Sequence, residues 1–402
     1  MAKYYQSPRW TSEFTFCSTP MTFDQYSICS FRCAYCLSQF QRFYFDSYHK
    51  REVHQVNVQA VKRLFLGKTK SPFSKYIKAR KRMQWGGLSD PFCWIERERG
   101  VGLELLRFFR EIDYPLYIAT KGVWWLDDPR YTELLKDNKS WKFRVAISTF
   151  DKSKALRLER GVATPEKRLK AIEKINSLNC GGAILRLRPF IFGISDLTYR
   201  ELIKAGIDCG IKGLSLGFFC NDISISKENL AIINRLAGFD VMKFYIKYSP
   251  GGASPYRLNR KIKRKFVDEV EGICQDSGVK FSVGDRHFKE RNHTDFDNYD
   301  ETHCSGQFAY AASFCRAKGR VRWRDIEKDM EHLVGVRYSG INHEKAERRA
   351  RFHSFDLKDY MHYLWNNPKE YCSPYRLFEG VLKPARLDSD GNVVYKFNTE
   401  RA

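Results

Sequence analysis

Three cysteines near the start of the chain stand close enough together to act as one set of ligands. Cys29, Cys33 and Cys36 fall within eight consecutive residues. Three thiolates can hold three corners of a cuboidal iron–sulfur cluster and leave its fourth iron open. A structural zinc site needs a fourth ligand and is typically built from paired C-x2-C halves, and neither is found nearby. A chance grouping of packed cysteines is the other alternative, so the spacing favours an iron–sulfur cluster on a loop.

The order C-x3-C-x2-C, with the aromatic Tyr35 just before the third cysteine, resembles the signature of the radical S-adenosylmethionine (SAM) superfamily. The resemblance implies a 4Fe-4S cluster on Cys29, Cys33 and Cys36, with SAM at the open iron and Tyr35 among the cofactor-binding residues. It also implies that an electron, supplied by an external donor such as flavodoxin or ferredoxin, cleaves SAM to a 5'-deoxyadenosyl radical that abstracts hydrogen from a substrate. The cofactor supplies this chemistry, and the protein has to orient and shield it.

Five more residues match the superfamily's SAM-binding pattern by position. Gly86 and Gly87 follow a predicted strand and look like the motif whose backbone receives the methionyl amino group, a close approach that glycine permits. Ser148 ends a strand, where the family places polar contacts to the ribose. Arg186 and Arg188 alternate with apolar residues and so point to one face, where one of them would meet the methionyl carboxylate. Taken singly, these residues are equally compatible with an ordinary turn, strand end or solvated edge.

Three short segments resemble one branch of the superfamily, the branch that includes spore photoproduct lyase, which repairs thymine dimers in DNA. They are residues 88–92 (LSDPF), 119–122 (ATKG) and 160–165 (RGVATP), the last followed by 167–169 (KRL). In the lyase a cysteine returns hydrogen to the product radical, whereas the matching position here is Gly87. Cys93 is a candidate to replace it, and the alternative is that Cys93 is a buried packing residue.

Cys304 is a second candidate for this catalytic role. It lies in residues 303–306 (HCSG), which look similar to the closing segment of uncharacterised members of the branch. Cys304 would donate hydrogen or ligate metal, and together with Cys315 and Cys372 it would allow a second cluster.

The elements that must position these residues follow an alternating hydrophobic pattern. We expect strands at residues 115–120, 143–148, 184–192, 213–219 and 241–248, and helices at 101–112, 165–178, 197–209 and 226–236. Strands separated by helices imply right-handed βαβ units, and hence an α/β fold, a partial or full parallel (β/α) barrel of radical SAM type. Ligands of such a barrel bind at the carboxyl ends of its strands. Residues 1–250 are expected to form this core with its cluster loop, and 251–402 a basic C-terminal extension that closes or flanks the barrel mouth.

The charge of the chain indicates a polyanionic partner. Lys and Arg number 70 against 47 Asp and Glu, which gives a net charge of +23. Nucleic acid is the partner that such a charge favours, through release of counterions from phosphates, and an ordinary basic surface is the alternative. The N-terminus has no signal-peptide pattern, and no run of about 18 apolar residues is present. The expectation is a cytoplasmic protein that does not enter a membrane.

These observations lead to a radical SAM enzyme that acts on nucleic acid or a nucleotide, in repair or modification. One alternative is a radical SAM enzyme whose substrate is a peptide or small metabolite, for which substrate binding would survive high salt. Another is a nucleic-acid-binding protein whose cluster is structural or redox-sensing and which does not turn over SAM. The sequence predicts no oligomeric state.

Overall fold

The structure of the chain is a computed structural model that describes residues 7–10, 21–36, 38, 52–223, 225–250, 256–291, 308–327, 357–370 and 373–402. By their internal contacts the residues form two compact units, Met1–Arg9 with Met21–Lys280, and Trp10–Pro20 with Phe281–Ala402. The borders between the units fall within β1 (Arg9–Trp10) and β10 (Lys280–Val283). No helix among the described residues is long and apolar enough to cross a bilayer.

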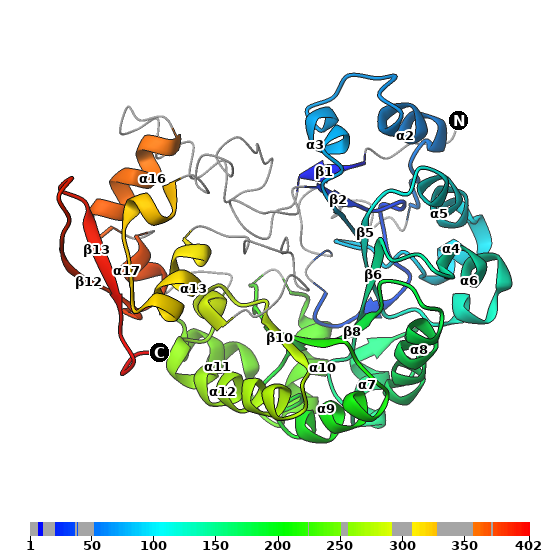
Figure 1. Ribbon diagram of the computed structural model, residues 1–402. Coiled ribbons are helices and arrows are strands. Elements are labelled where there is room, and N and C mark those ends of the chain that lie inside the picture. The colour runs from blue at the N-terminus through cyan, green and yellow to red at the C-terminus, as the bar shows by residue number, and fades with distance from the viewer. Residues whose placement is uncertain are drawn as a thin grey trace. The chain divides into compact units, whose positions relative to one another are not determined.

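A parallel sheet forms the centre of the first unit (Figure 1). Six of its described strands pair in parallel, in the order β2 (Met21–Phe23), β4 (Met83–Trp85), β5 (Leu116–Thr120), β6 (Trp141–Ala146), β8 (Ala183–Phe190) and β9 (Gly213–Phe218). Each strand follows the previous one along the chain and is added on the same side of the sheet. This is the α/β architecture that the alternating pattern predicts, in the form of a partial (β/α) barrel.

The helices of the first unit lie on the outside of this curved sheet (Figure 1). They are α2 (Val58–Phe65), α3 (Ser74–Lys78), α4 (Trp94–Arg99), α5 (Val101–Glu111), η2 (Trp124–Asp127), α6 (Pro129–Leu135), α7 (Lys152–Leu158), α8 (Pro165–Ser177), α9 (Tyr199–Asp208), α10 (Lys227–Ala237), α11 (Val241–Tyr248) and α12 (Arg260–Asp276). Local signals set their starts: Thr164 caps α8 with Pro165 in its first turn, and Ser226 accepts a hydrogen bond from the backbone of Asn229 at the start of α10. Both starts confirm the sequence prediction.

One predicted strand, residues 241–248, is wrong, because this segment is helix α11. Its residues are rich in β-branched and aromatic types, which favour strands in isolation. The side chain of Asp240, however, accepts a hydrogen bond from the backbone N–H of Lys243 and so caps a helix. Val241 and Tyr245 are buried one helical turn apart, so helical packing decides the conformation.

The predicted domain border near residue 250 differs from the border in the structure, which lies at Lys280. The basic segment after residue 256 forms α12, and α12 belongs to the first unit because its apolar face packs there. Phe266 contacts the aromatic rings of Phe190 and Phe192, at centroid distances of 5.1 and 5.2 Å. The basic residues of this segment therefore belong to the barrel unit.

The two faces of the sheet differ in chemistry. One face packs on the helices, as Trp85 does against Phe109 of α5. The opposite, inner face carries polar and cationic side chains, because alternate residues of a strand point to opposite faces. Tyr117 lies at its centre, with the guanidinium carbons of Arg144 and Arg82 at 4.3 and 4.7 Å from its ring centroid. The inner face is thus a basic lining around an aromatic ring.

The second unit contains a small antiparallel sheet in the strand order β11 (Arg320–Val321), β13 (Val393–Phe397) and β12 (Leu382–Leu387). Its helical elements are η3 (Arg286–Arg291), α13 (Ala309–Lys318), η4 (Trp323–Asp325), α16 (Leu357–Asn366) and α17 (Pro374–Leu377). Trp365 of α16 anchors the helix on the sheet: its indole N–H donates to the carbonyl of Val393, 2.7 Å away, and its ring contacts Tyr395.

Candidate cluster site

The loop that carries the three cysteines follows β2, the first strand of the parallel sheet. It is held at its centre by a short antiparallel pairing of β3 (Arg32–Cys33) with β7 (Glu159–Arg160), in which Cys33 faces Glu159. The next residue continues the attachment, since the N–H of Ala34 donates to the carbonyl of Leu158 at 2.8 Å. The backbone around Cys33 is thereby fixed to the segment after α7, beyond the carboxyl end of β6.

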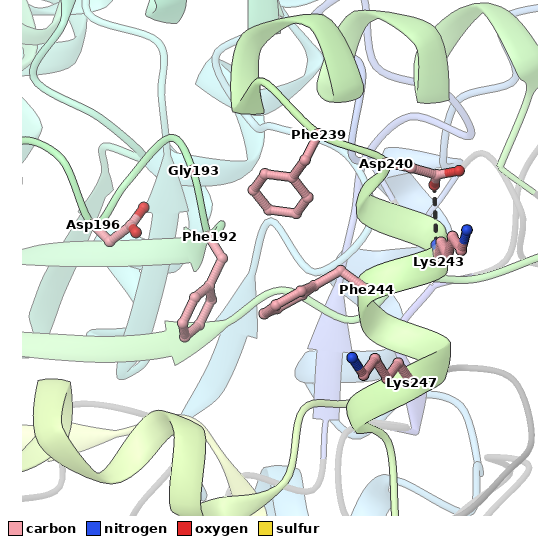
Figure 2. A pocket seen from close by; sticks show the side chains of 8 residues that line it. All are labelled: Phe192, Gly193, Asp196, Phe239, Asp240, Lys243, Phe244 and Lys247. Atoms are coloured by element: carbon pink, nitrogen blue, oxygen red, sulfur yellow. Dashed lines mark hydrogen bonds between the residues drawn. The ribbon is translucent and has the colours of Figure 1, made fainter.

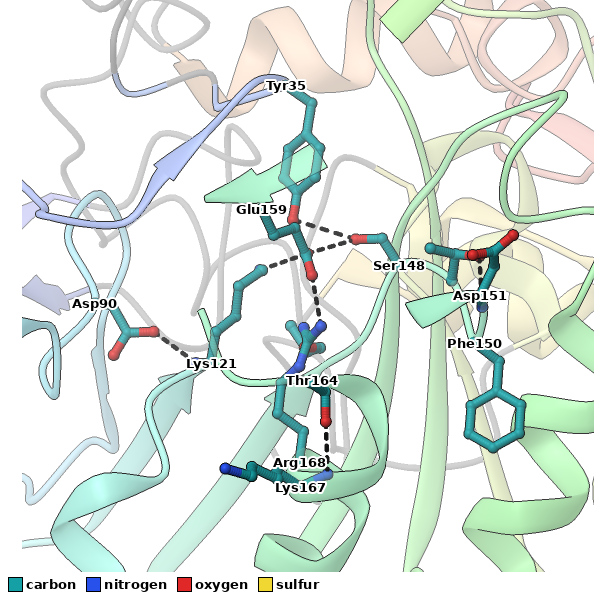
Figure 3. A network of polar contacts seen from close by, with 12 residues as sticks. Tyr35, Asp90, Lys121, Ser148, Phe150, Asp151, Glu159, Thr164, Lys167 and Arg168 are labelled. Carbon is teal, nitrogen blue, oxygen red and sulfur yellow. Dashed lines mark hydrogen bonds and ion pairs between the residues drawn. The ribbon is translucent and has the colours of Figure 1, made fainter. Parts of the chain in front are cut away.

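A buried polar network centred on Glu159 lies beneath this loop (Figure 3). The hydroxyl of Tyr35 donates to the Glu159 carboxylate, and the hydroxyl of Ser148 donates to its Oε1 at 2.9 Å. Arg168 pairs with Oε2 at 2.6 Å, and Lys121 Nζ lies 4.0 Å from Oε1. The carboxylate thus joins the cluster loop to β6, α8 and the loop after β5.

The cations of this network keep Glu159 ionised. Burial by itself would raise the pKa of the carboxyl, but the charges of Arg168 and Lys121 outweigh burial and hold its pKa below the ordinary value. Cys33, next to this network, has a raised pKa because its thiol is buried. Metal binding would offset this effect, since a thiol that ligates a metal is deprotonated.

Tyr35 and Ser148 were predicted as cofactor contacts. The hydroxyls of both residues donate hydrogen bonds to Glu159 and lie 3.2 Å apart. In the structure they hold the cluster loop in place, and their contact with SAM stays a prediction. Glu159 and Arg168 were not predicted as site residues. A buried ion pair between a helix and a loop leaves no short-range pattern in the sequence, because its members become neighbours only on folding.

The segments 88–92 and 119–122 meet at Asp90, which is half-buried. Its carboxylate accepts hydrogen bonds from the hydroxyl of Thr120 at 2.7 Å and from the backbone N–H of Lys121 at 2.5 Å. Burial raises the pKa of Asp90. The carboxylate therefore fixes the main chain of Lys121, whose ammonium lies 5.7 Å from the Tyr35 ring centroid (Figure 3). Lys121 belongs to the segment 119–122 (ATKG), but the sequence did not predict it as a site residue.

Gly86 and Gly87 form the turn that follows β4. Gly86 has a φ of +92°, and a Cβ there would stand 2.3 Å from the carbonyl oxygen of Ala119. A Cβ at Gly87 would stand 2.3 Å from Oγ1 of Thr22. Packing against neighbouring strands thus requires both glycines, whether or not their backbone receives SAM, and that role stays a prediction.

Arg186 and Arg188 lie on the inner face of the sheet, where strand alternation predicts them together. Arg186 is in register with Ala146 of β6 and Ser215 of β9. The side chain of Arg188 lies over Gly217, whose hypothetical Cβ would come within 2.7 Å of the Arg188 Cδ. Both arginines thus share a face with Arg144, and a contact of either with SAM stays a prediction.

Of the two candidate hydrogen donors, Cys93 and Cys304, the structure describes only Cys93. Cys93 is fully buried at the start of α4, and its thiol is hydrogen-bonded to the thiol of Cys29 on the cluster loop. Cys304 lies outside the described residues, as does Cys372. Cys315 is buried in the second unit, with its thiol 3.6 Å from the carbonyl of Tyr395.

A hollow of the first unit lies away from this loop, between the end of β8 and the start of α11 (Figure 2). It encloses about 590 Å³ and is lined by Phe192, Phe239 and Phe244, with Asp196, Lys243 and Lys247 at its margin. None of its lining residues belongs to the cluster loop or to the Glu159 network. We assign the chemistry to the cysteine loop because no cysteine lines the hollow.

In the described part of the chain, no three His, Cys, Asp or Glu side chains are gathered closely enough to hold a single metal ion. A cuboidal cluster does not need that geometry, because each thiolate binds a different iron. Three thiols on one loop, anchored at Cys33 and close to the cationic Lys121, fit such a cluster. Cys29, Cys33 and Cys36 are the residues that would hold it.

Comparison with known proteins bears on the fold of the chain. Neither a family model nor a curated protein sequence matches the chain. Among solved structures, a spore photoproduct lyase C140S mutant superposes with a TM-score of 0.51 and 17% identity, over 71% of this chain and 80% of that chain. The chain shares the fold of spore photoproduct lyase.

Two further structures are similar to the chain. Spore photoproduct lyase complexed with dinucleoside spore photoproduct matches with a TM-score of 0.50 and 17% identity, over 70% of this chain and 80% of that chain. SuiB of Streptococcus suis bound to S-adenosylmethionine matches more weakly, with a TM-score of 0.45 and 15% identity, over 76% of this chain and 58% of that chain. At these identities the similarity with the lyase concerns the fold alone.

Proposed function

We propose that this protein is a radical SAM enzyme whose 4Fe-4S cluster is held by Cys29, Cys33 and Cys36. One observation carries the proposal: within a radical SAM fold, the loop that bears the three thiols is anchored above the buried Glu159 network, beyond the strands' carboxyl ends. Ligands of parallel (β/α) barrels bind at that end of the strands. When bound, the cluster would supply the electron that cleaves SAM.

The protein's own residues would orient and shield this chemistry. Glu159 holds Tyr35 and the backbone opposite Cys33, so the loop keeps one conformation. Lys121 brings a positive charge next to the ring of Tyr35, with a side chain that is 17% exposed and therefore little screened by water. A cation at this position suits an anionic group such as a carboxylate.

We further propose that the substrate is nucleic acid or a nucleotide. The net charge of +23 supports this proposal, because Lys and Arg side chains bind phosphates and release their counterions. The lyase, whose fold this chain shares, has been solved with a dinucleoside photoproduct. Cys304 keeps its predicted role as a hydrogen donor or metal ligand.

The proposed function is tested by anaerobic reconstitution with iron and sulfide, reduction with dithionite, and measurement of 5'-deoxyadenosine formed from SAM. Wild-type protein is expected to bind the cluster and form the product, and Cys33→Ala to lose both. Cys209→Ala is the matched control, because Cys209 is a half-buried cysteine that ends α9 and lies outside the cluster loop. A wild-type protein that binds the cluster but does not cleave SAM would support a structural or redox-sensing role instead.

A further inference from the structure

Cys93 is placed against the cluster loop by its own helix. It is fully buried, stands directly before α4, and its backbone N–H donates to the carbonyl of Asp90 at 3.2 Å. Its carbonyl accepts the N–H of Glu96 at 2.9 Å, which closes the first turn. Its thiol shares a hydrogen bond with the thiol of Cys29, and while both are free thiols this contact raises the pKa of Cys29 and lowers that of Cys93.

Residues next to the two cysteines reinforce this contact. The backbone N–H of Trp94, which follows Cys93, donates to the hydroxyl of Ser30, which follows Cys29, at 2.8 Å. The indole N–H of Trp94 donates to the carbonyl of Gly161 at 2.9 Å, close to the β7 segment that pairs with Cys33. Two consecutive residues of the loop thus face two consecutive residues of α4, so the thiol pair is fixed by backbone geometry.

We propose that Cys93 donates an S–H···S hydrogen bond to the Cys29 thiolate and thereby raises the reduction potential of the cluster. This inference rests on the proposed function, because it takes Cys29 as an iron ligand. Once Cys29 ligates iron it is a thiolate and can only accept, so the proton of the pair then belongs to Cys93. Hydrogen bonds to cluster sulfurs stabilise the more negative, reduced state.

In this role Cys93 acts through Cys29 and is a positioning residue. Cys93 has no exposed surface, so its thiol does not reach a substrate. Because the thiol contacts Cys29, it is suited to tuning this iron ligand. Electron transfer into the cluster would become easier with Cys93 present, which matters because SAM cleavage begins with a reduced cluster.

The test is a redox titration of the reconstituted cluster, followed by electron paramagnetic resonance without SAM, in wild type, Cys93→Ala and Cys93→Ser. Alanine removes the donor, and the equilibrium between reduced and oxidised cluster is expected to shift about tenfold toward the oxidised form, which is ~59 mV for one electron. Serine keeps a donor and should restore most of the potential. Cys274→Ala, a buried cysteine of α12, is the matched control and should leave the potential unchanged.

The outcomes separate this inference from the proposed function. A cluster with the same potential in wild type and Cys93→Ala would overturn the hydrogen bond and leave the proposed function intact. Loss of the cluster from both variants would also overturn it, since Cys93 would then be a ligand. A shifted potential in a protein that never cleaves SAM would support the hydrogen bond and contradict the proposed function. Absence of a cluster in the wild type would overturn both.

Discussion

At the scale of single residues, the ion pair between Glu159 and Arg168 fixes β7, the strand that pairs with the cluster loop, to α8. Both side chains are almost fully buried, with exposed fractions of 1% and 0%. Taking two charges out of water is costly, and the cost is offset only while each charge keeps its partner. The pair therefore gives the loop a defined position more than it adds net stability.

Replacing Glu159 with glutamine is expected to lower the free energy of unfolding by about 3–5 kcal/mol, because Arg168 would remain buried without a compensating charge. Urea unfolding measures the change. Glu133→Gln is the control, since Glu133 pairs with Lys136 at the surface and its loss should cost less than about 1 kcal/mol. Equal losses in both variants would contradict a special role for Glu159.

The same residue predicts a pH dependence. The pKa of Glu159 is lowered in the folded state relative to the ordinary value of 4.5, so its contribution is present above that pH and is lost as the pH falls through the lowered pKa. The stability difference between wild type and Glu159→Gln should therefore be largest near neutral pH and shrink below about pH 4.5. Unfolding curves of both proteins from neutral to acid pH give this difference. A gap that widened in acid would contradict the assigned direction.

At the scale of elements, the turn after β4 depends on the close approach of β4 and β5. Asp24, which follows β2, also holds this turn, because its carboxylate accepts the backbone N–H groups of Leu88 and Ser89 at 2.9 and 2.8 Å. The turn therefore has little freedom to move away from a larger side chain.

Gly86→Ala is accordingly expected to destabilise the protein by about 2–5 kcal/mol, from backbone strain at positive φ and from the clash with the Ala119 carbonyl. Gly67→Ala provides a matched control, since Gly67 also has a positive φ, +72°, but has no atom within 4 Å of the added Cβ. Strain alone should cost that variant about 1–2 kcal/mol. Thermal or urea unfolding compares the two, and equal costs would show that the turn can relax.

At the scale of the whole molecule, the net charge of +23 governs the proposed encounter with nucleic acid. Binding of a short single-stranded DNA should weaken about tenfold or more between roughly 50 and 200 mM salt, because each phosphate contact releases counterions. Fluorescence anisotropy at several salt concentrations measures the slope. Binding that is absent, or that does not respond to salt, would turn the search toward a peptide or small metabolite.

Short-range patterns were enough to predict much of this protein. The three cysteines are close together in the sequence, so their spacing could be recognised directly. Strand and helix periodicities can be detected over about ten residues, so the parallel α/β fold and most elements of the barrel could be predicted. The starts of α8 and α10 were marked by Pro165 and by Ser226, whose roles depend on the next few residues alone.

Only the tertiary structure decided which distant residues support the loop. Glu159 and Tyr35 are separated by more than a hundred positions, as are the backbone partners Cys33 and Glu159, and no local pattern joins them. The same reason applies to Cys93 and Cys29, whose contact depends on where α4 is packed. The conformation of α11 was also settled by burial of one helical face, which outweighed the strand preference of its residues. Local preference and periodicity act along the chain, whereas burial and charge pairing act across it.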